Sequence, residues 1–291
     1  MKGSAFEYIR PETCEEACEL KDQFSDNAIF WAGGTDLLPL WKDGIISPQY
    51  CIDISEIADL IHIVFNNSQF YIGAATNLSD IEASSILREK VPSLGEVSNQ
   101  MATPQLRNLA TIGGNICNAS PAADLAVALL ALDAKLKLLS VKGERFLALS
   151  EFFHGRRLTA IRQNELLAEI IIPLTGLCTT GFFKKVGRTS VDIALANVSA
   201  AIIAEKNIIT ETRISMGAVA SRPIRALAAE KILIGMDGTK LNDFTLREVS
   251  SKASDEAQPV SDMRAPVAYR REIVKVIVKR ALDGALKRTK V

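Results

Sequence analysis

The sequence contains very little histidine, and this shortage limits the chemistry that the chain can perform by itself. Only His62 and His154 occur among the 291 residues, and neither belongs to a Ser-His-Asp or HExxH pattern. Histidine is the most frequent general acid or base because its ordinary pKa lies near neutral pH. We therefore expect both histidines to be structural, no residue to be catalytic or to bind a metal, and a cofactor to carry any reaction.

Cysteines and long apolar segments are also scarce. The five cysteines include no C-x-x-C pair, whereas an iron–sulfur cluster needs several converging thiolates. The longest apolar run, residues 125–132, is far shorter than the roughly 18 residues that span a bilayer. The first residues, MKGSAFEYIRPE, lack the apolar region of a secretory signal. These absences predict a cytoplasmic protein that carries no metal cluster and enters no membrane.

The chain has no excess charge of either sign. Lys and Arg number 34, as do Asp and Glu, whereas proteins dedicated to nucleic acids usually show a basic excess. The phosphate-binding patterns GxGxxG after a strand and GxxxxGK[ST] are absent too, which removes the best support for Rossmann and P-loop folds. A hydrophobic content of 48% over 291 residues predicts instead a globular protein of about two domains.

Hydrophobic patterning predicts hairpins and helices, and hence an α+β fold in two parts. Turns at residues 66–68 and 142–144 each join two short strands. The predicted helices and strands of the second half follow a Gly- and Thr-rich linker, residues 174–181, where we place a domain boundary. Helices are predicted over residues 13–24, 77–88, 93–101, 121–132, 226–234, 244–253 and 266–287, and an antiparallel meander over 182–186, 194–204 and 208–218.

Two Gly-Gly pairs are the most informative local feature. Each lies beside polar residues, in the segments Gly33-Gly34-Thr35-Asp36 and Thr111-Ile112-Gly113-Gly114-Asn115. Without a Cβ, a glycine lets a phosphate approach the backbone, and successive N–H groups can turn toward it. An ordinary tight turn is the alternative for either pair taken alone, but two pairs with polar neighbours could hold a pyrophosphate from two sides.

Other residues near these pairs carry weaker signals. Ser120 and Asp124 stand near the start of a predicted helix, where an acidic residue is usually a partner of the helix dipole, although both could bind sugar or ribityl hydroxyls. Met101 is typical of a core residue. Lys184 and Lys185 are ordinarily solvated, but one of them could face the negative charge of a reduced cofactor.

Five segments, which together cover nearly the whole chain, carry a resemblance to a known family. They are AGGTDLLP (32–39), TPQLRNLATIGGNICNASPAADL (103–125), ELLAEIIIP (165–173), FFKKVGRTSVDIA (182–194) and RAPVAYRREIVKVIVKRAL (264–282). The second is highly specific, and the others are modest singly but strong together. In this order they resemble the FAD-binding (medium) subunit of molybdenum hydroxylases, the family of xanthine dehydrogenase and carbon monoxide dehydrogenase.

The resemblance implies a fold and a set of cofactor contacts. It implies a vanillyl-alcohol-oxidase-type (PCMH-type) FAD-binding domain over residues 1–175, with two α/β subdomains (about 1–55 and 56–175), and a C-terminal α+β domain over 180–291. It implies that the FAD pyrophosphate lies against Ala32, Gly33, Gly34, Thr35, Asp36, Leu37, Thr111, Gly113, Gly114 and Asn115. Ile116, Cys117, Ser120 and Asp124 would line its sugar and ribityl region, Leu166 and Leu167 its adenine side, and Met101 and Lys184 the flavin. Met101 departs from the aromatic residue common in eukaryotic relatives.

The resemblance also implies a function. In the family, one partner subunit holds two [2Fe-2S] clusters and another holds the molybdenum cofactor, where substrate is hydroxylated. Electrons then pass through the clusters to FAD and on to NAD or another acceptor. The chain would thus be the non-covalent FAD subunit, because no histidine lies in the flavin segments, and it would bind no nucleic acid.

Two other functions stay open. A free-standing flavin reductase of the same fold would need its own substrate pocket with an acid, and a non-catalytic FAD-binding assembly module would need no turnover. The substrate of the complex is not encoded here, because its pocket lies on another chain; we mildly prefer a purine.

Overall fold

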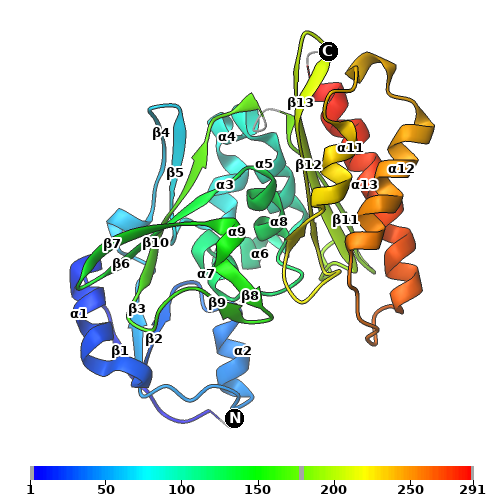
Figure 1. Cartoon of the computed structure of the whole chain (residues 1–291). Coiled ribbons are helices and arrows are strands. Elements are labelled where there is room, and N and C mark those ends of the chain that lie inside the picture. The colour runs from blue at the N-terminus through cyan, green and yellow to red at the C-terminus, as the bar shows by residue number, and fades with distance from the viewer. Residues whose placement is uncertain (1–2, 177–179, 290–291) are drawn as a thin grey trace.

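Three β-sheets, each drawn from a consecutive part of the chain, organise the fold (Figure 1). The computed structural model describes residues 3–176 and 180–289. The predicted linker over residues 174–181 lies partly outside the described residues, at 177–179. The mixture of helices and mainly antiparallel strands confirms the α+β class.

The first sheet is parallel, in the order β1 (Glu7–Ile9), β3 (Tyr50–Asp53) and β2 (Ala28–Trp31). Helix α1 (Cys14–Phe24) begins at the N-cap Thr13, whose side chain accepts a hydrogen bond from Glu16 N. Helix α2 (Leu37–Lys42) follows β2. The chain between β2 and α2 contains the first glycine pair, so this small sheet positions that pair.

The second sheet has the order β4 (Ile63–Asn66), β5 (Gln69–Gly73), β10 (Leu166–Pro173), β6 (Lys135–Ser140) and β7 (Gly143–Ala148), with antiparallel neighbours. Both predicted hairpins are confirmed. The intervening helices are α3 (Leu78–Ala83), α4 (Ser85–Lys90), α5 (Pro92–Gln100), α6 (Pro104–Arg107), α7 (Ile112–Cys117), α8 (Asp124–Ala131) and α9 (Leu149–Phe152), and a small hairpin comprises β8 (Phe153–Gly155) and β9 (Leu158–Thr159). Helix α8 is buried over its whole length.

One predicted helix in this region is wrong. Residues 77–88 form two helices, α3 and α4, which are separated at Ser84. Ser84 leaves the helical conformation with a ψ of 112°, and its side chain accepts a hydrogen bond from Leu87 N as the N-cap of α4. A serine favours this arrangement because its hydroxyl replaces a missing backbone acceptor.

The third sheet is antiparallel, in the order β11 (Phe182–Val186), β12 (Ala196–Glu205), β13 (Ile208–Gly217) and β14 (Ile224–Arg225), so the meander is confirmed. Helices α11 (Leu227–Leu233), α12 (Asp243–Glu256) and α13 (Val267–Arg288) cover one face, while α8 and α5 lie on the other (Figure 1). Short 3-10 turns span Ser25–Asn27, Ala58–Leu60 and Gly238–Lys240. The boundaries of the domains themselves stay a prediction.

Candidate functional site

The segment after β2 contains consecutive backbone N–H groups that the protein does not use. Residues 32–36 lead from β2 into α2, and Gly34 has a positive φ of 65°, a conformation that glycine adopts most readily. The N–H groups of residues 33–37 donate to no acceptor within the described part of the chain. Successive free N–H groups form concavities that bind anions, and this geometry supports the predicted pyrophosphate contact of the segment.

The two glycine pairs are held together by close backbone packing. A Cβ on Gly33 would lie 1.7 Å from the carbonyl oxygen of Leu109, just before the second pair, and one on Gly113 would lie 2.6 Å from the Cβ of Ala74. A Cβ on Gly34 would meet the Trp31 ring at 2.6 Å. At Gly114 a Cβ would lie 2.9 Å from the Thr111 hydroxyl, which belongs to a side chain and not to the backbone of another segment. Protein packing therefore already requires the absence of a Cβ at Gly33, Gly34 and Gly113, and the phosphate contacts expected of the four glycines stay a prediction.

The second pair lies in the first turn of α7 and not in a free turn. Thr111 is the N-cap, and its Oγ1 accepts a hydrogen bond of 3.1 Å from Gly114 N. The N–H groups of Ile112, Gly113 and Asn115 donate to backbone carbonyls. The expected row of free N–H groups in this segment is thus wrong, because capping and packing have already satisfied them.

Asn115 has a polar side-chain atom without a partner in the described protein, whereas the N–H groups at the start of α7 are already hydrogen-bonded. Its Oδ1 is buried and has no hydrogen-bond partner in the described protein. Because buried polar atoms are almost always hydrogen-bonded, this oxygen indicates a place for a ligand donor such as a hydroxyl group. One orphan acceptor beside Gly114, together with the free N–H groups of residues 33–37, fits a cofactor that has both phosphates and hydroxyls.

Asp36 and Cys117 are exposed to solvent, yet protein surrounds them on several sides. The surrounding protein excludes part of the water and so raises the pKa of both groups, for Cys117 to about 12, and Arg157 partly offsets this effect at Asp36. Accessible side chains in a partly desolvated setting are typical of the wall of a recess. Ile116, between these features and the core, is fully buried, so its side chain belongs to the packing.

Asp124 forms a buried ion pair across the junction between the second and third sheets. Its Oδ2 lies 2.7 Å from Lys185 Nζ, and each side chain is only 6% exposed. Asn197 on β12 donates to Oδ1, and Lys185 also donates to the carbonyl oxygen of Gln100 at 3.3 Å. Burial raises the pKa of Asp124, although Lys185 and Asn197 oppose the shift. All these contacts leave Asp124 a structural anchor rather than a free acceptor for sugar hydroxyls.

Lys184 lies on the opposite face of β11 from Lys185. Its Nζ is 4.9 Å from the centre of the Phe182 ring, and it lines a pocket of about 350 Å³ with residues of α13. Alternate residues of a strand point to opposite faces, so the two lysines cannot both face Asp124. Lys185 therefore faces Asp124 and Lys184 faces α13, and the flavin contact expected of Lys184 stays a prediction.

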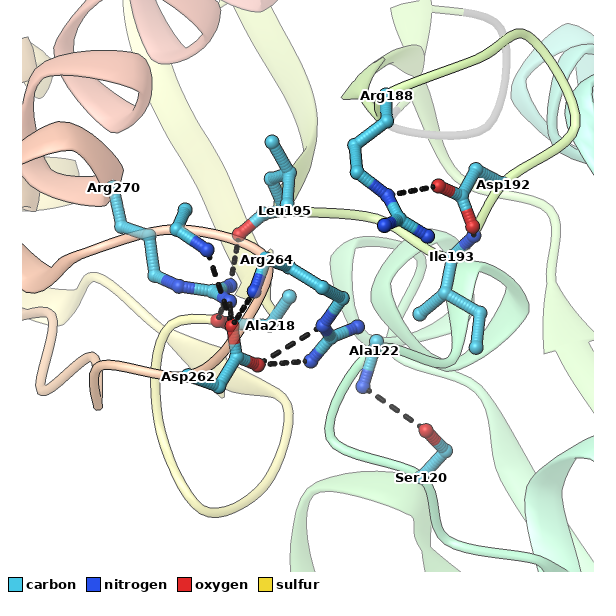
Figure 2. Close-up of polar contacts among 11 residues, drawn as sticks. Ser120, Ala122, Arg188, Asp192, Ile193, Leu195, Ala218, Asp262, Arg264 and Arg270 are labelled. Carbon is cyan, nitrogen blue, oxygen red and sulfur yellow. Dashed lines mark hydrogen bonds and ion pairs between the residues drawn. The ribbon is translucent and has the colours of Figure 1, made fainter.

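The other predicted site residues differ in burial and in hydrogen bonding. Met101 is half-buried against the core of the second sheet, and Leu166 and Leu167 are buried at the start of β10. Ser120 Oγ accepts a hydrogen bond of 3.3 Å from Ala122 N (Figure 2). Ala119, which precedes Ser120, has a positive φ of 45°, and such strain in residues other than glycine concentrates at functional sites.

A cluster of arginines and carboxylates lies where the loop before β12 approaches the start of α13 (Figure 2). Arg270, 1% exposed, donates to the carbonyl oxygens of Leu195 and Ala218 and forms an ion pair of 2.7 Å with Asp262. Arg264 also pairs with Asp262, and Arg188 pairs with Asp192. Sequence reasoning did not identify Arg270, Asn197 or Lys185 as a group, since nothing in their spacing indicates that their elements meet.

Residues 3–176 and 180–289 include neither a cluster of potential metal ligands nor a helix that could span a membrane. No group of three His, Cys, Asp or Glu side chains could hold a metal ion there. None of the helices there is long and apolar enough to cross a membrane.

Two family models together match nearly the whole chain. "FAD binding domain in molybdopterin dehydrogenase" matches residues 4–175, and "CO dehydrogenase flavoprotein C-terminal domain" matches residues 181–285. The chain belongs to the FAD-binding medium subunits of the molybdenum hydroxylases. As a member of this family it is a flavoprotein component of an oxidoreductase, and its cofactor is FAD.

Relatives of this medium subunit align along almost their full length. The glyceraldehyde dehydrogenase medium chain of Sulfolobus acidocaldarius is 38% identical over 95% of this chain and 96% of its own. The carbon monoxide dehydrogenase medium chain of Afipia carboxidovorans is 31% identical over the whole of both chains. A chain in the crystal structure of the cyanide-inactivated Cu,Mo-CO dehydrogenase superposes with a TM-score of 0.93 at 30% identity, covering 99% of this chain and 100% of that one.

Proposed function

We propose that this chain is the electron-transfer subunit of a three-part molybdenum hydroxylase. It receives electrons from the [2Fe-2S] clusters of one partner subunit, while a second partner holds the molybdenum cofactor and hydroxylates the substrate. The observation that carries the proposal is the row of free N–H groups at residues 33–37, packed through Gly33 against the segment that leads to Thr111. It supports binding of the FAD pyrophosphate at this segment, and no group of three His, Cys, Asp or Glu side chains that could hold a metal ion occurs among the described residues.

Bound FAD would supply the chemistry of accepting electrons and passing them on. The N–H groups of residues 33–37 would hold its phosphates, and Asn115 Oδ1 would accept a hydrogen bond from one of its hydroxyl groups. Lys185 would hold Asp124 and Gln100 in place beside the ring region, and Met101 would exclude water there. The chain itself moves no proton in this scheme, consistent with its two histidines.

We propose NAD as the acceptor of the assembled complex. The loop from Val186 to Asp192, with Gly187 and the Arg188–Asp192 pair, leaves small and polar groups at the surface. A nicotinamide needs one open face of the flavin, and this loop is the proposed edge of that opening. The names of the relatives include glyceraldehyde and carbon monoxide as well as the purines caffeine and xanthine, so the purine preferred from the sequence stays one substrate class among several.

We also propose a cytoplasmic location. Cys14, Cys18, Cys51 and Cys117 are free thiols, and thiols persist unpaired in reducing compartments.

Anaerobic reconstitution tests the function. The isolated chain should be yellow and should oxidise neither a purine nor an aldehyde, and adding the two purified partners and substrate should bleach the flavin. The partners alone should reduce their clusters without passing electrons to NAD. A yellow chain with turnover of its own would favour the free-standing reductase, and a colourless chain would favour the assembly module. Reduction of artificial dyes without NADH formation would refute only the choice of NAD.

A further inference from the structure

Arg107 is a buried arginine that binds one short stretch of backbone. It lies at the end of α6 and is 9% exposed. Its NH1 donates to three carbonyl oxygens, those of Asn99 at 3.4 Å, Met101 at 3.1 Å and Ala102 at 3.0 Å. Its Nε lies 2.9 Å from Glu82 Oε2, as an ion pair without hydrogen-bond geometry. A single cation therefore gathers one carbonyl from the end of α5 and two from the turn that joins α5 to α6.

The backbone of this turn is in a conformation that needs such support. Ala102 has a positive φ of 50°, which is unfavourable for any residue with a Cβ and persists only where the surroundings enforce it. The charge-assisted hydrogen bonds of Arg107 to the carbonyls on both sides of the Ala102 α-carbon supply that enforcement.

The gathered carbonyls determine where the neighbouring N–H groups point. A trans peptide directs its C=O and N–H to opposite sides. Because the carbonyls of Met101 and Ala102 face Arg107, the N–H groups of Ala102 and Thr103 face away from it. Neither of these N–H groups has an acceptor among residues 3–176 and 180–289.

The turn lies next to the candidate cofactor site. Lys185, which is paired with Asp124, donates to the carbonyl oxygen of Gln100, one residue before Met101. Met101 packs on the core of the second sheet beside these groups. The two free N–H groups therefore occur on a segment that borders the proposed site, where a reduced ring accumulates negative charge.

We infer that Arg107 is a positioning residue, which holds the 99–103 turn so that the N–H groups of Ala102 and Thr103 donate to the electron-rich edge of the bound flavin. The inference rests on the proposed function and adds to it a source of stabilisation for the reduced cofactor. It requires Arg107 to act through the turn and not to touch the flavin.

The test compares Arg107→Met, which keeps the length of the side chain but removes its donors, with Arg107→Lys, whose ammonium can still donate to these carbonyls. We expect Arg107→Met to weaken FAD binding on the order of tenfold, to lower the midpoint potential of the bound flavin in an anaerobic dithionite titration, and to change its visible circular dichroism. Arg107→Lys should recover part of each change. The matched control is Arg225→Met, which breaks an ion pair with Glu230 in the C-terminal part and should leave the potential unchanged.

Wild-type affinity and potential in Arg107→Met would overturn the inference, as would equal effects of the Met and Lys variants in folded protein. If Arg107→Met does not fold, Arg107→Lys decides: a shifted potential supports the inference, and an unshifted potential with unchanged affinity and circular dichroism overturns it. A wild-type chain that binds no FAD would instead refute the proposed function, so the two failures are distinguishable.

Discussion

The Lys185–Asp124 pair should contribute far more to stability than a surface pair of the same length. Both it and the Arg188–Asp192 pair have an N–O distance of 2.7 Å, but the first is 6% exposed on each side whereas Arg188 is 60% exposed. Lys185→Met leaves the Asp124 carboxylate buried with Asn197 as its side-chain donor. Removing one partner of a buried pair costs about 3–5 kcal/mol, and we expect a loss of this size in the free energy of unfolding.

The stability loss caused by Lys185→Met should depend on pH. Burial already raises the pKa of Asp124, and loss of Lys185 should raise it further. The cost of the unpaired carboxylate is therefore present above this raised pKa and disappears as the pH falls toward the unfolded value near 3.8. The loss caused by Lys185→Met should accordingly be greatest at pH 7 and shrink as the solution is acidified.

Equilibrium urea unfolding of the FAD-free chain measures these changes without a contribution from cofactor binding. Arg188→Met is the matched control and should change the unfolding free energy little, because solvent screens an exposed pair. The double variant Lys185→Met/Asp124→Leu leaves no buried charge and should be more stable than Lys185→Met alone. Equal losses in Lys185→Met and Arg188→Met would refute the reasoning that burial decides the contribution.

Four further expectations follow from the site and the charge distribution. Gly114→Val should weaken FAD binding with a largely unchanged far-UV circular dichroism spectrum, because its Cβ would displace the Thr111 hydroxyl, at 2.9 Å, but would meet no backbone of another segment; unchanged affinity would contradict this. Gly34→Val should also lower the thermal midpoint, because its positive φ of 65° costs a residue with a Cβ roughly 1–2 kcal/mol; a wild-type midpoint would contradict this. Cys117, with its pKa raised to about 12, should react with N-ethylmaleimide at pH 7.5 much more slowly than in urea, and more slowly still with FAD; fast reaction in the native chain would refute this. The basic residues of α13, such as Lys275, Lys279 and Lys287, should bind no DNA because the chain as a whole has no excess charge, and a salt-dependent nanomolar affinity would contradict this.

The sequence was sufficient for the elements whose signals are local. Both hairpins have turn residues between apolar strands, and the first helix has the N-cap Thr13. The break at Ser84 had a local signal too, since Ser84 and Ser85 interrupt the apolar pattern, but the overall helical periodicity concealed it. The free N–H groups of residues 33–37 follow from a Gly-Gly pair directly after a strand, which made that half of the site predictable.

Contacts between distant segments were not predictable in the same way. The first turn of α7 uses carbonyls of Thr76 and Ala74 as acceptors, and no feature of residues 111–115 reveals that those carbonyls are close. Which of Lys184 and Lys185 pairs with Asp124 was equally unpredictable from the sequence. In the stretch Phe-Phe-Lys-Lys, either face of the strand carries one phenylalanine and one lysine, so the alternation of side chains leaves both choices equally good.

The position of Gly284 bears on the order in which the two faces of β11 find their partners during synthesis. A Cβ at this position would lie 2.4 Å from the Phe182 ring, so α13 offers a gap that accepts the phenylalanine of one face, and slipping β11 by one residue would exchange the faces. Because chains emerge from the ribosome N-terminus first, the partners of Lys185, which are Asp124 and the carbonyl oxygen of Gln100, are already synthesised when β11 emerges, whereas Gly284 follows much later. The contacts of the Lys185 face can therefore form first, and the docking of α13 then encloses Phe182 on the other face.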